Sequence, residues 1–357
     1  MGTDTSGLRW LEELYPGYFT LTMATGIISI GLGLLEASAL SSLMYWLTLI
    51  SWLTLFGLYA ARLALFPKAV WADLMNPRQT FNFFSLVAAT SICGLLLHLH
   101  GHYNLALLCW AVAFFAWLAL LYYSFGVLAL LHGERNINIV DGGWLICIVG
   151  TQSLVLLGLK IIPQLGSYDT VIMLLIFMLW GLGLILYGIF VTLFCYRVFF
   201  LEMKLDDYTP QMWVIMGAAA ISANASSSLD MAPPILTVLY EVHPVIDSMA
   251  LITWAWASWW IPLLTVVSFW KHVIKKVPVG YDPRQWSIVF PLGMYTVASV
   301  QLSLAAEFDP LHWISHIMVW VAVAMWGLLI IAVLRRVAAG LFTRATPGPE
   351  STRERRS

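Results

Sequence analysis

Charged residues are scarce in this chain: Asp, Glu, Lys and Arg make up 10% of its 357 residues. A soluble globular domain carries about 25% charge. Apolar residues make up 61%, and the mean hydropathy is +0.83. The formal net charge is −1, so the overall charge does not point to a nucleic-acid partner. The composition is typical of an integral membrane protein and excludes an ordinary soluble domain.

Motifs that hold metals or cofactors are also lacking. The four cysteines each lie in an apolar run, without CxxC or Cys/His spacing: Cys93, Cys109, Cys147 and Cys195. We expect them to be small buried apolar residues. No HExxH pattern is present. The sequence therefore predicts no cofactor, no metal and no catalytic residue, and we do not expect an enzyme. Residues 1–17 are polar and acidic and lack the features of a cleavable signal peptide.

Long apolar runs fill most of the chain, and each is near the length of roughly 20 residues that a helix needs to cross a bilayer. Polar or charged connections separate them. We predict ten crossings, at 17–36, 42–66, 80–99, 103–132, 142–162, 168–200, 210–228, 245–271, 284–305 and 312–337.

The positive charges are unevenly divided between the connections. If both termini are cytoplasmic, all of the 18 Lys and Arg residues except Lys160 fall on the cytoplasmic side. Positive residues concentrate in cytoplasmic loops of membrane proteins. The division predicts an even number of crossings in the cell (inner) membrane, with both termini cytoplasmic.

Odd and even segments differ in character. The odd ones are rich in Gly, Ser and Thr, whereas the even ones are longer and rich in Leu, Trp, Tyr and Phe. Small and hydroxylated residues are typical of close helix packing or of water-lined surfaces, and aromatic-rich helices are typical of the lipid boundary. We expect five hairpins, each placing one polar helix towards a central path. The alternative is that the small residues serve tight packing only.

The ninth segment is RQWSIVFPLGMYTVASVQLSLAAE. It carries Phe290 immediately before Pro291, and Gly293 follows Pro291 after one intervening residue. Proline removes a backbone donor and crowds the preceding turn, so we expect a kink or local break near Phe290. One hypothesis is a bent, pore-lining helix with a bulky ring at its bend. The other is a kinked packing helix whose Phe290 faces lipid or a neighbouring helix.

Several segments resemble those of a known family: PGYFTLTMATGI, GGWLICIVGTQS, PQMWVIMGAAAI, WAWASWWIPLL and WSIVFPLGMYTVA. The chain looks like the tellurite-resistance/dicarboxylate transporter family, which includes fungal malate and sulfite transporters and the plant slow anion channel. The resemblance implies ten helices, as five hairpins around a quasi-five-fold pore. It also implies a homotrimer with one pore per subunit and a pore phenylalanine that matches Phe290. We divide the chain into an N-terminal cytoplasmic segment (1–14), a membrane domain (15–338) and a disordered tail (339–357).

The resulting hypothesis is a channel or transporter for a small organic or inorganic anion, such as a dicarboxylate, sulfite, a tellurite-related species, a halide or nitrate. Passive permeation is favoured, and a proton-coupled dicarboxylate carrier is the alternative. Phe290 is the expected gate, with Pro291 and Gly293 at the kink. Candidate pore-lining residues, each of which could instead make an interhelical hydrogen bond, are Thr25, Ser91, Gln152, Asn224 and Thr296.

Two sets of residues leave other functions open. His98, His100 and His102 form the sequence HLHGH, whose spacing could suit a metal or a proton relay. A membrane enzyme would need a converging set of acid, base or metal ligands, which the fold would have to assemble from Asp230, Glu241, His243 and Asp247. A purely structural membrane protein is the third possibility, and a solid bundle without a central cavity would favour it.

Overall fold

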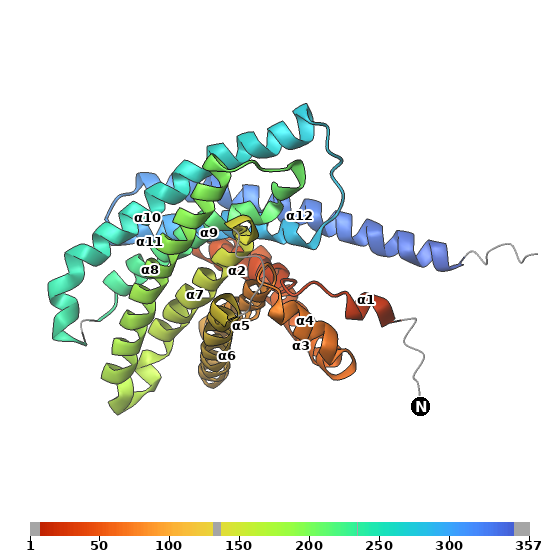
Figure 1. The fold of residues 1–357 in the computed structure, drawn as a ribbon. Coiled ribbons are helices and arrows are strands. Elements are labelled where there is room, and N and C mark those ends of the chain that lie inside the picture. Colours follow the sequence, from red (N-terminus) through yellow and green to blue (C-terminus); the bar gives the residue numbers. More distant parts are fainter. Residues whose placement is uncertain (1–7, 131–136, 234, 346–357) are drawn as a thin grey trace, which may run out of the picture.

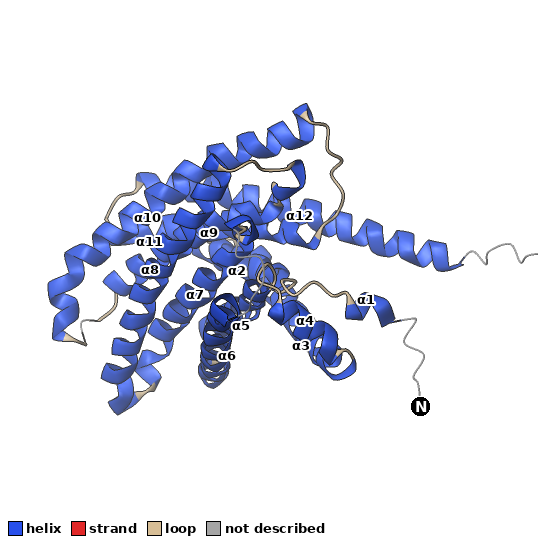
Figure 2. Cartoon of the chain, in the orientation of Figure 1, coloured by secondary structure: helices blue, strands red, loops and turns tan. Residues whose placement is uncertain are grey.

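The computed structural model describes residues 8–130, 137–233 and 235–345. The described residues form helices joined by short loops and contain no strand (Figure 2). The predicted all-α membrane class is therefore confirmed. Nine helical segments within these residues are long and apolar enough to cross a membrane, and α2 is a shorter apolar helix of 15 residues. A count of ten crossings and a five-fold symmetry remain predictions.

The long helices follow one another as five hairpins: α2 (Thr20–Leu34) with α3 (Ser38–Leu65), α5 (Phe84–Leu99) with α6 (Tyr103–Leu130), α7 (Ile146–Ile161) with α8 (Asp169–Phe200), α9 (Val214–Asp230) with α10 (Thr237–Phe269), and α11 (Trp286–Ala305) with α12 (Pro310–Ala345). Two short helices, α1 (Arg9–Glu12) and α4 (Pro67–Met75), lie beside the first hairpin. Single 3₁₀ turns lead into four helices: Thr80–Phe83 before α5, Gly142–Leu145 before α7, Pro210–Trp213 before α9 and Pro283–Gln285 before α11.

The first helix of each hairpin is central and the second is peripheral. In the spans that contain α5, α7, α9 and α11, between 78% and 94% of the residues in the most apolar stretch are buried. The corresponding share for α3, α6, α8, α10 and α12 is between 17% and 39%. The sequence contrast between odd and even segments therefore matches a real division between central and peripheral helices.

The central helices close a ring. They pack in the order α2, α5, α7, α9 and α11, and α11 packs back against α2. The peripheral helices follow in chain order around them (Figure 1). Small residues permit close approach between the backbones: a Cβ at Gly217 would lie 2.7 Å from Cγ of Pro291, and one at Gly293 would lie 2.7 Å from Cγ2 of Ile27.

Helix α11 is continuous through Pro291. The local break considered from the sequence does not occur, although proline still removes one backbone donor from the helix. The ring of Pro291 instead packs onto Gly217 of α9. Pro291 and Gly293 therefore act in this structure as contact points between central helices.

Two helices extend beyond the predicted segments. Helix α12 continues to Ala345, so residues 339–345 are helical rather than part of a disordered tail. Residues 346–357 lie outside the described residues. Helix α10 begins at Thr237, before the predicted crossing starts at residue 245, and it continues through Pro244. The boundary between the N-terminal segment and the membrane domain stays a prediction.

Candidate functional site

A cavity of about 380 Å³ lies where the five central helices end, here called the far end. Every central helix contributes to its wall, so it is on the axis of the ring. The lining residues on those helices are Ile27, Ser29, Ile30, Gly33 and Leu34 from α2, Ile92, Leu95, Leu96 and Leu99 from α5, Ser153, Leu156 and Lys160 from α7, Ile221, Asn224 and Ser228 from α9, and Met294, Val297 and Gln301 from α11. The bundle is therefore not solid at this end.

The far-end cavity is mostly apolar, and Lys160 is the single Lys or Arg in its wall. None of the ion pairs among the described residues involves Lys160. His100 also lines the cavity, with its ring stacked on Tyr45 at 3.8 Å between centroids. The one cation absent from the predicted cytoplasmic side thus lies in the cavity wall, where it can attract an anion.

Phe290 is buried, with 2% of its surface exposed. It precedes Met294 by four residues, Val297 by seven and Gln301 by eleven. This spacing places all four side chains on one face of the helix. Those three residues line the far-end cavity. Phe290 therefore continues the same face of α11 beyond the cavity, one turn closer to the helix starts. Its role as a gate stays a prediction.

Among the five candidate lining residues, Asn224 is in the cavity wall. Its side-chain nitrogen lies 3.7 Å from the sulfur of Met294, and its oxygen accepts from Ser228 at 3.4 Å. Asn224 thus joins the cavity surfaces of α9 and α11.

Thr25 and Gln152 lie elsewhere, between a central and a peripheral helix. The Thr25 hydroxyl accepts from Nε1 of Trp326 at 2.9 Å. Gln152 donates to the backbone carbonyl of Trp180 at 3.2 Å. Both match the alternative stated for them, an interhelical hydrogen bond, and neither lines the far-end cavity.

Ser91 and Thr296 are also absent from the far-end cavity wall. Each donates its hydroxyl to the carbonyl four residues earlier in its own helix, at 3.0 Å and 3.1 Å. A hydroxyl satisfied within its own helix needs no contact with water. The sequence did not single out Lys160, Ser228 or Gln301 as lining residues, although helical spacing from Asn224 and Phe290 points to the last two.

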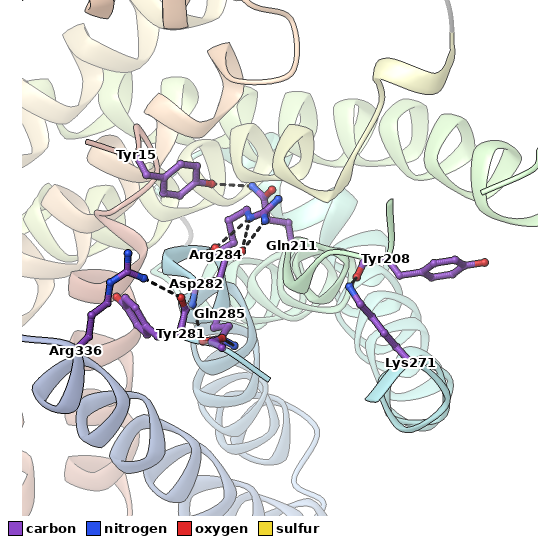
Figure 3. A network of polar contacts seen from close by, with 10 residues as sticks. Tyr15, Tyr208, Gln211, Lys271, Tyr281, Asp282, Arg284, Gln285 and Arg336 are labelled. Atoms are coloured by element: carbon purple, nitrogen blue, oxygen red, sulfur yellow. Dashed lines mark hydrogen bonds and ion pairs between the residues drawn. The ribbon is translucent and has the colours of Figure 1, made fainter. Parts of the chain in front are cut away.

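The opposite end, where the central helices begin, is here called the basic end. Its centre is closed by a polar network. The side-chain nitrogen of Gln211 donates to the hydroxyl of Tyr15 and to Oδ1 of Asn82, each at 2.9 Å. Tyr15 precedes α2, Asn82 precedes α5 and Gln211 precedes α9. Figure 3 shows Tyr15 and Gln211 facing one another, with Arg284 beside them.

Glycine permits the turn before α7 to reach this network. A Cβ at Gly142 would lie 2.0 Å from the backbone oxygen of Gln211, and one at Gly143 would lie 2.6 Å from Oδ1 of Asn82. Any side chain at Gly142 would collide with backbone. Close packing at this point therefore explains the two glycines of the GGWLICIVGTQS segment.

A second cavity, of about 190 Å³, lies at the basic end. Its wall holds three arginines and three aspartates: Arg78, Arg197, Arg284, Asp141, Asp206 and Asp207. Burial raises the pKa of Asp141 to about 6, against the opposing effects of the backbone N–H of Gly143 and the nearby Arg197 and Arg78. Asp141 can therefore change its protonation state near neutral pH.

Some cations of the basic end hold loops in place. Arg197 is 2.8 Å from Asp207, and Lys271 donates to the backbone carbonyl of Tyr208 at 2.8 Å. Arg284 pairs with Asp282; burial alone would raise the pKa of Asp282, but hydrogen bonds from Arg284 hold it below its usual value. Figure 3 shows the Lys271 and Arg284 contacts. The positive charge at this end therefore has a structural role as well.

Comparison with known proteins decides the family. The profile of the voltage-dependent anion channel family, SLAC1, matches residues 13–334. The chain belongs to this family. The resemblance found in the sequence is confirmed. Membership in the SLAC1 family supports a multi-pass membrane protein of the anion channel or transporter type and points away from an enzyme.

Relatives of this SLAC1-family chain agree with that conclusion. An uncharacterized membrane protein of Mycobacterium tuberculosis is 36% identical over 144 residues, which are 40% of this chain and 72% of the relative. Two uncharacterized transporters of Methanocaldococcus jannaschii match almost throughout. One is 21% identical over 94% of this chain and 96% of its own length, and the other is 20% identical over 93% and 97%.

The histidines of HLHGH and the residues around Asp230 were the two sets that left other functions open, and the structure arranges them differently. His98, His100 and His102 do not gather into a metal-binding group, whereas Asp230, His243 and Asp247 do; this is the one such group within the part of the chain that the structure describes. Glu241 is not part of it. The group lies at the far end, outside the cavity wall.

Proposed function

We propose that the protein lets small organic or inorganic anions cross the cell membrane passively through the centre of the helix ring. Phe290 closes the path between the far-end cavity and the basic end. The basic end faces the cytoplasm, both termini are cytoplasmic, and the protein is a homotrimer with one path per subunit. The observation that carries the proposal is a cavity walled by all five central helices, with Phe290 on the cavity-facing side of α11 directly beyond it.

The electrostatics of the path suit a mobile anion. A full charge held at the membrane midplane is costly and would trap its counter-ion. Here the cations are at the ends. Lys160 is at one end, and at the other three arginines share a cavity wall with three aspartates. The five central helices all begin at the basic end, so the positive ends of their dipoles point there. Between the ends, the amide of Asn224 offers a neutral donor.

The gate is tested by measuring uptake of nitrate and chloride into proteoliposomes. Removing the ring in Phe290→Ala leaves a gap in the path and is expected to raise flux at least about tenfold, because an apolar constriction blocks ions by excluding water. Phe194→Ala, which truncates an equally buried phenylalanine on the peripheral helix α8, is the control. Unchanged flux in a folded Phe290→Ala protein would remove Phe290 from the gate.

Proton-coupled transport is the second candidate, and Asp141 is the observation that favours it. It offers a carboxyl with a pKa of about 6 in the cavity of the basic end. Coupled transport predicts that a dicarboxylate accumulates only when a proton gradient is imposed, and that Asp141→Asn abolishes this requirement. Equal flux with and without the gradient supports the passive proposal.

A further inference from the structure

Three potential metal ligands meet at the far end, on two helices of one hairpin. Asp230 is the last residue of α9, and His243 and Asp247 lie one turn apart near the start of α10. Nε2 of His243 is 2.9 Å from Oδ1 of Asp230, and Nδ1 is 3.7 Å from Oδ2 of Asp247. One ligand atom from each residue can be chosen so that all lie within 4.8 Å of one another.

The Asp230 carboxylate is buried and lacks a well-aligned donor. Its side chain is 8% exposed, and its Oδ1 lies 2.9 Å from Nε2 of His243 without the geometry of a hydrogen bond. A buried carboxylate oxygen without a well-aligned donor is costly, because water no longer solvates it. The other two side chains are about half exposed, at 50% for His243 and 53% for Asp247. The group is thus anchored by a buried oxygen and open to solvent on its other side.

A neutral imidazole does not satisfy this arrangement. It carries one N–H and one lone pair, and here each ring nitrogen faces a carboxylate, so one nitrogen would direct its lone pair at an anion. Nε2 also lies 3.3 Å from the backbone carbonyl of Asp230. A protonated imidazole would donate on both sides but would leave one net negative charge. A divalent cation balances both carboxylates and takes the lone pair of the neutral ring.

We propose that Asp230, His243 and Asp247 bind one divalent transition-metal ion of the zinc type. Zinc takes imidazole nitrogen and carboxylate oxygen at about 2.0–2.2 Å, which places tetrahedral ligand atoms ~3.4 Å apart. One ring nitrogen of His243 would bind the ion, so one of the two measured separations, 2.9 Å from Nε2 or 3.7 Å from Nδ1, is a distance between ligand atoms, and each is close to that value. Calcium and magnesium prefer six or more oxygen ligands and suit this group less well. Three protein ligands leave a coordination position for water.

The bound ion would join a central helix to a peripheral one. Asp230 follows Ser228, a cavity-lining residue, by two positions. The ion therefore fastens the end of α9 to α10 beside the mouth of the far-end cavity. It needs no contact with the permeating anion, so the site does not depend on the proposed function.

The test uses the full chain, purified in detergent and stripped with a chelator. Zinc binding is measured by calorimetric titration and by metal content after gel filtration. One zinc per chain is expected, with affinity at least about tenfold weaker in Asp230→Asn, in His243→Ala and in Asp247→Asn, since each removes one of three ligands. Glu241→Gln, a nearby acidic residue outside the group, and His98→Ala are controls that should retain wild-type affinity.

Asp247→Asn keeps the test decisive even if Asp230→Asn fails to fold, because Asp247 is half exposed. The proposal is wrong if no zinc remains bound, or if the ligand variants bind as tightly as the controls. It is also wrong about the class of ion if magnesium at the same concentration competes for the site. Loss of zinc from His98→Ala alone would place the binding in the HLHGH segment instead.

Discussion

The two ends of the helix ring are built on different principles. The basic end is closed by hydrogen bonds and by close backbone contacts at glycine, and one of its cavities, of about 190 Å³, is lined mainly by charged and amide side chains. The far end holds a cavity of about 380 Å³ that is apolar apart from a few hydroxyl, amide, imidazole and ammonium groups. Charged side chains are thus concentrated at one end of the ring, whereas the surface at the other end is mainly apolar.

Filling the closest contact of the basic end should have the largest effect. In Gly142→Ala the new Cβ would meet the backbone oxygen of Gln211 at 2.0 Å, which forces the turns apart. We expect a loss of roughly 1–3 kcal/mol or more in stability, the usual cost of overpacking. Thermal unfolding in detergent measures it. Gly188→Ala on α8, where the Cβ meets nothing within 4 Å, should unfold close to the wild-type temperature; an equal loss in both would refute the contact.

Protonation of Asp141 should open the basic end to anions. The folded pKa is about 6 against an ordinary value of 3.8. As pH falls through about 6 at that end, one of three negative charges disappears from a cavity that also holds three arginines, and the cavity becomes net positive. We expect chloride flux to rise several-fold. Asp141→Asn should give the high flux already at pH 7 and remove the pH dependence; a variant that keeps the wild-type profile would exclude Asp141.

The same group has a consequence for stability. Because the folded state binds this proton more tightly than the unfolded state, the Asp141 contribution is present below about pH 4 and is lost as pH rises through about 6. Unfolding temperatures of wild type and Asp141→Asn should therefore converge at low pH. At pH 7 the variant should be the more stable of the two.

The smallest effect is expected at the far end. Lys160→Gln removes the single ammonium group from that cavity wall, and flux driven from that side should fall by a few-fold at low ionic strength. At 0.15 M salt, where the screening length is about 8 Å, the difference should shrink. Measuring initial rates at two salt concentrations tests this. A salt-independent loss would indicate a structural role for Lys160.

Much of the fold could be predicted from the sequence, because central helices and lipid-facing helices differ in amino-acid composition. The segments around Gly150 and Gly217 carry small and hydroxylated residues among their apolar ones, and they form central helices. Boundaries were less accurate: nothing in the apolar pattern shows that α10 starts at Thr237 or that α12 reaches Ala345. Helices extend past the bilayer wherever loops permit, so hydropathy alone cannot place their ends.

The site was predicted less well, because composition does not tell which face of a helix points to the axis. Asn224 was found, but Ser91 and Thr296 satisfy their hydroxyls within their own helices. Spacing from Phe290 would have indicated Gln301. The meeting of Asp230 with His243 depends on the path of the connection between α9 and α10, which no periodic pattern specifies.

Cysteine modification tests the central claim most directly, in the Phe290→Ala background. A cysteine at Asn224 should lie in the path, and one at Thr25 should lie between α2 and α12. A bulky, negatively charged methanethiosulfonate reagent is added to each variant and to the parent, while anion flux is recorded. We expect strong block of Asn224→Cys, and no block of Thr25→Cys or of the parent. Unaltered flux through fully labelled Asn224→Cys would show that anions do not pass through the ring.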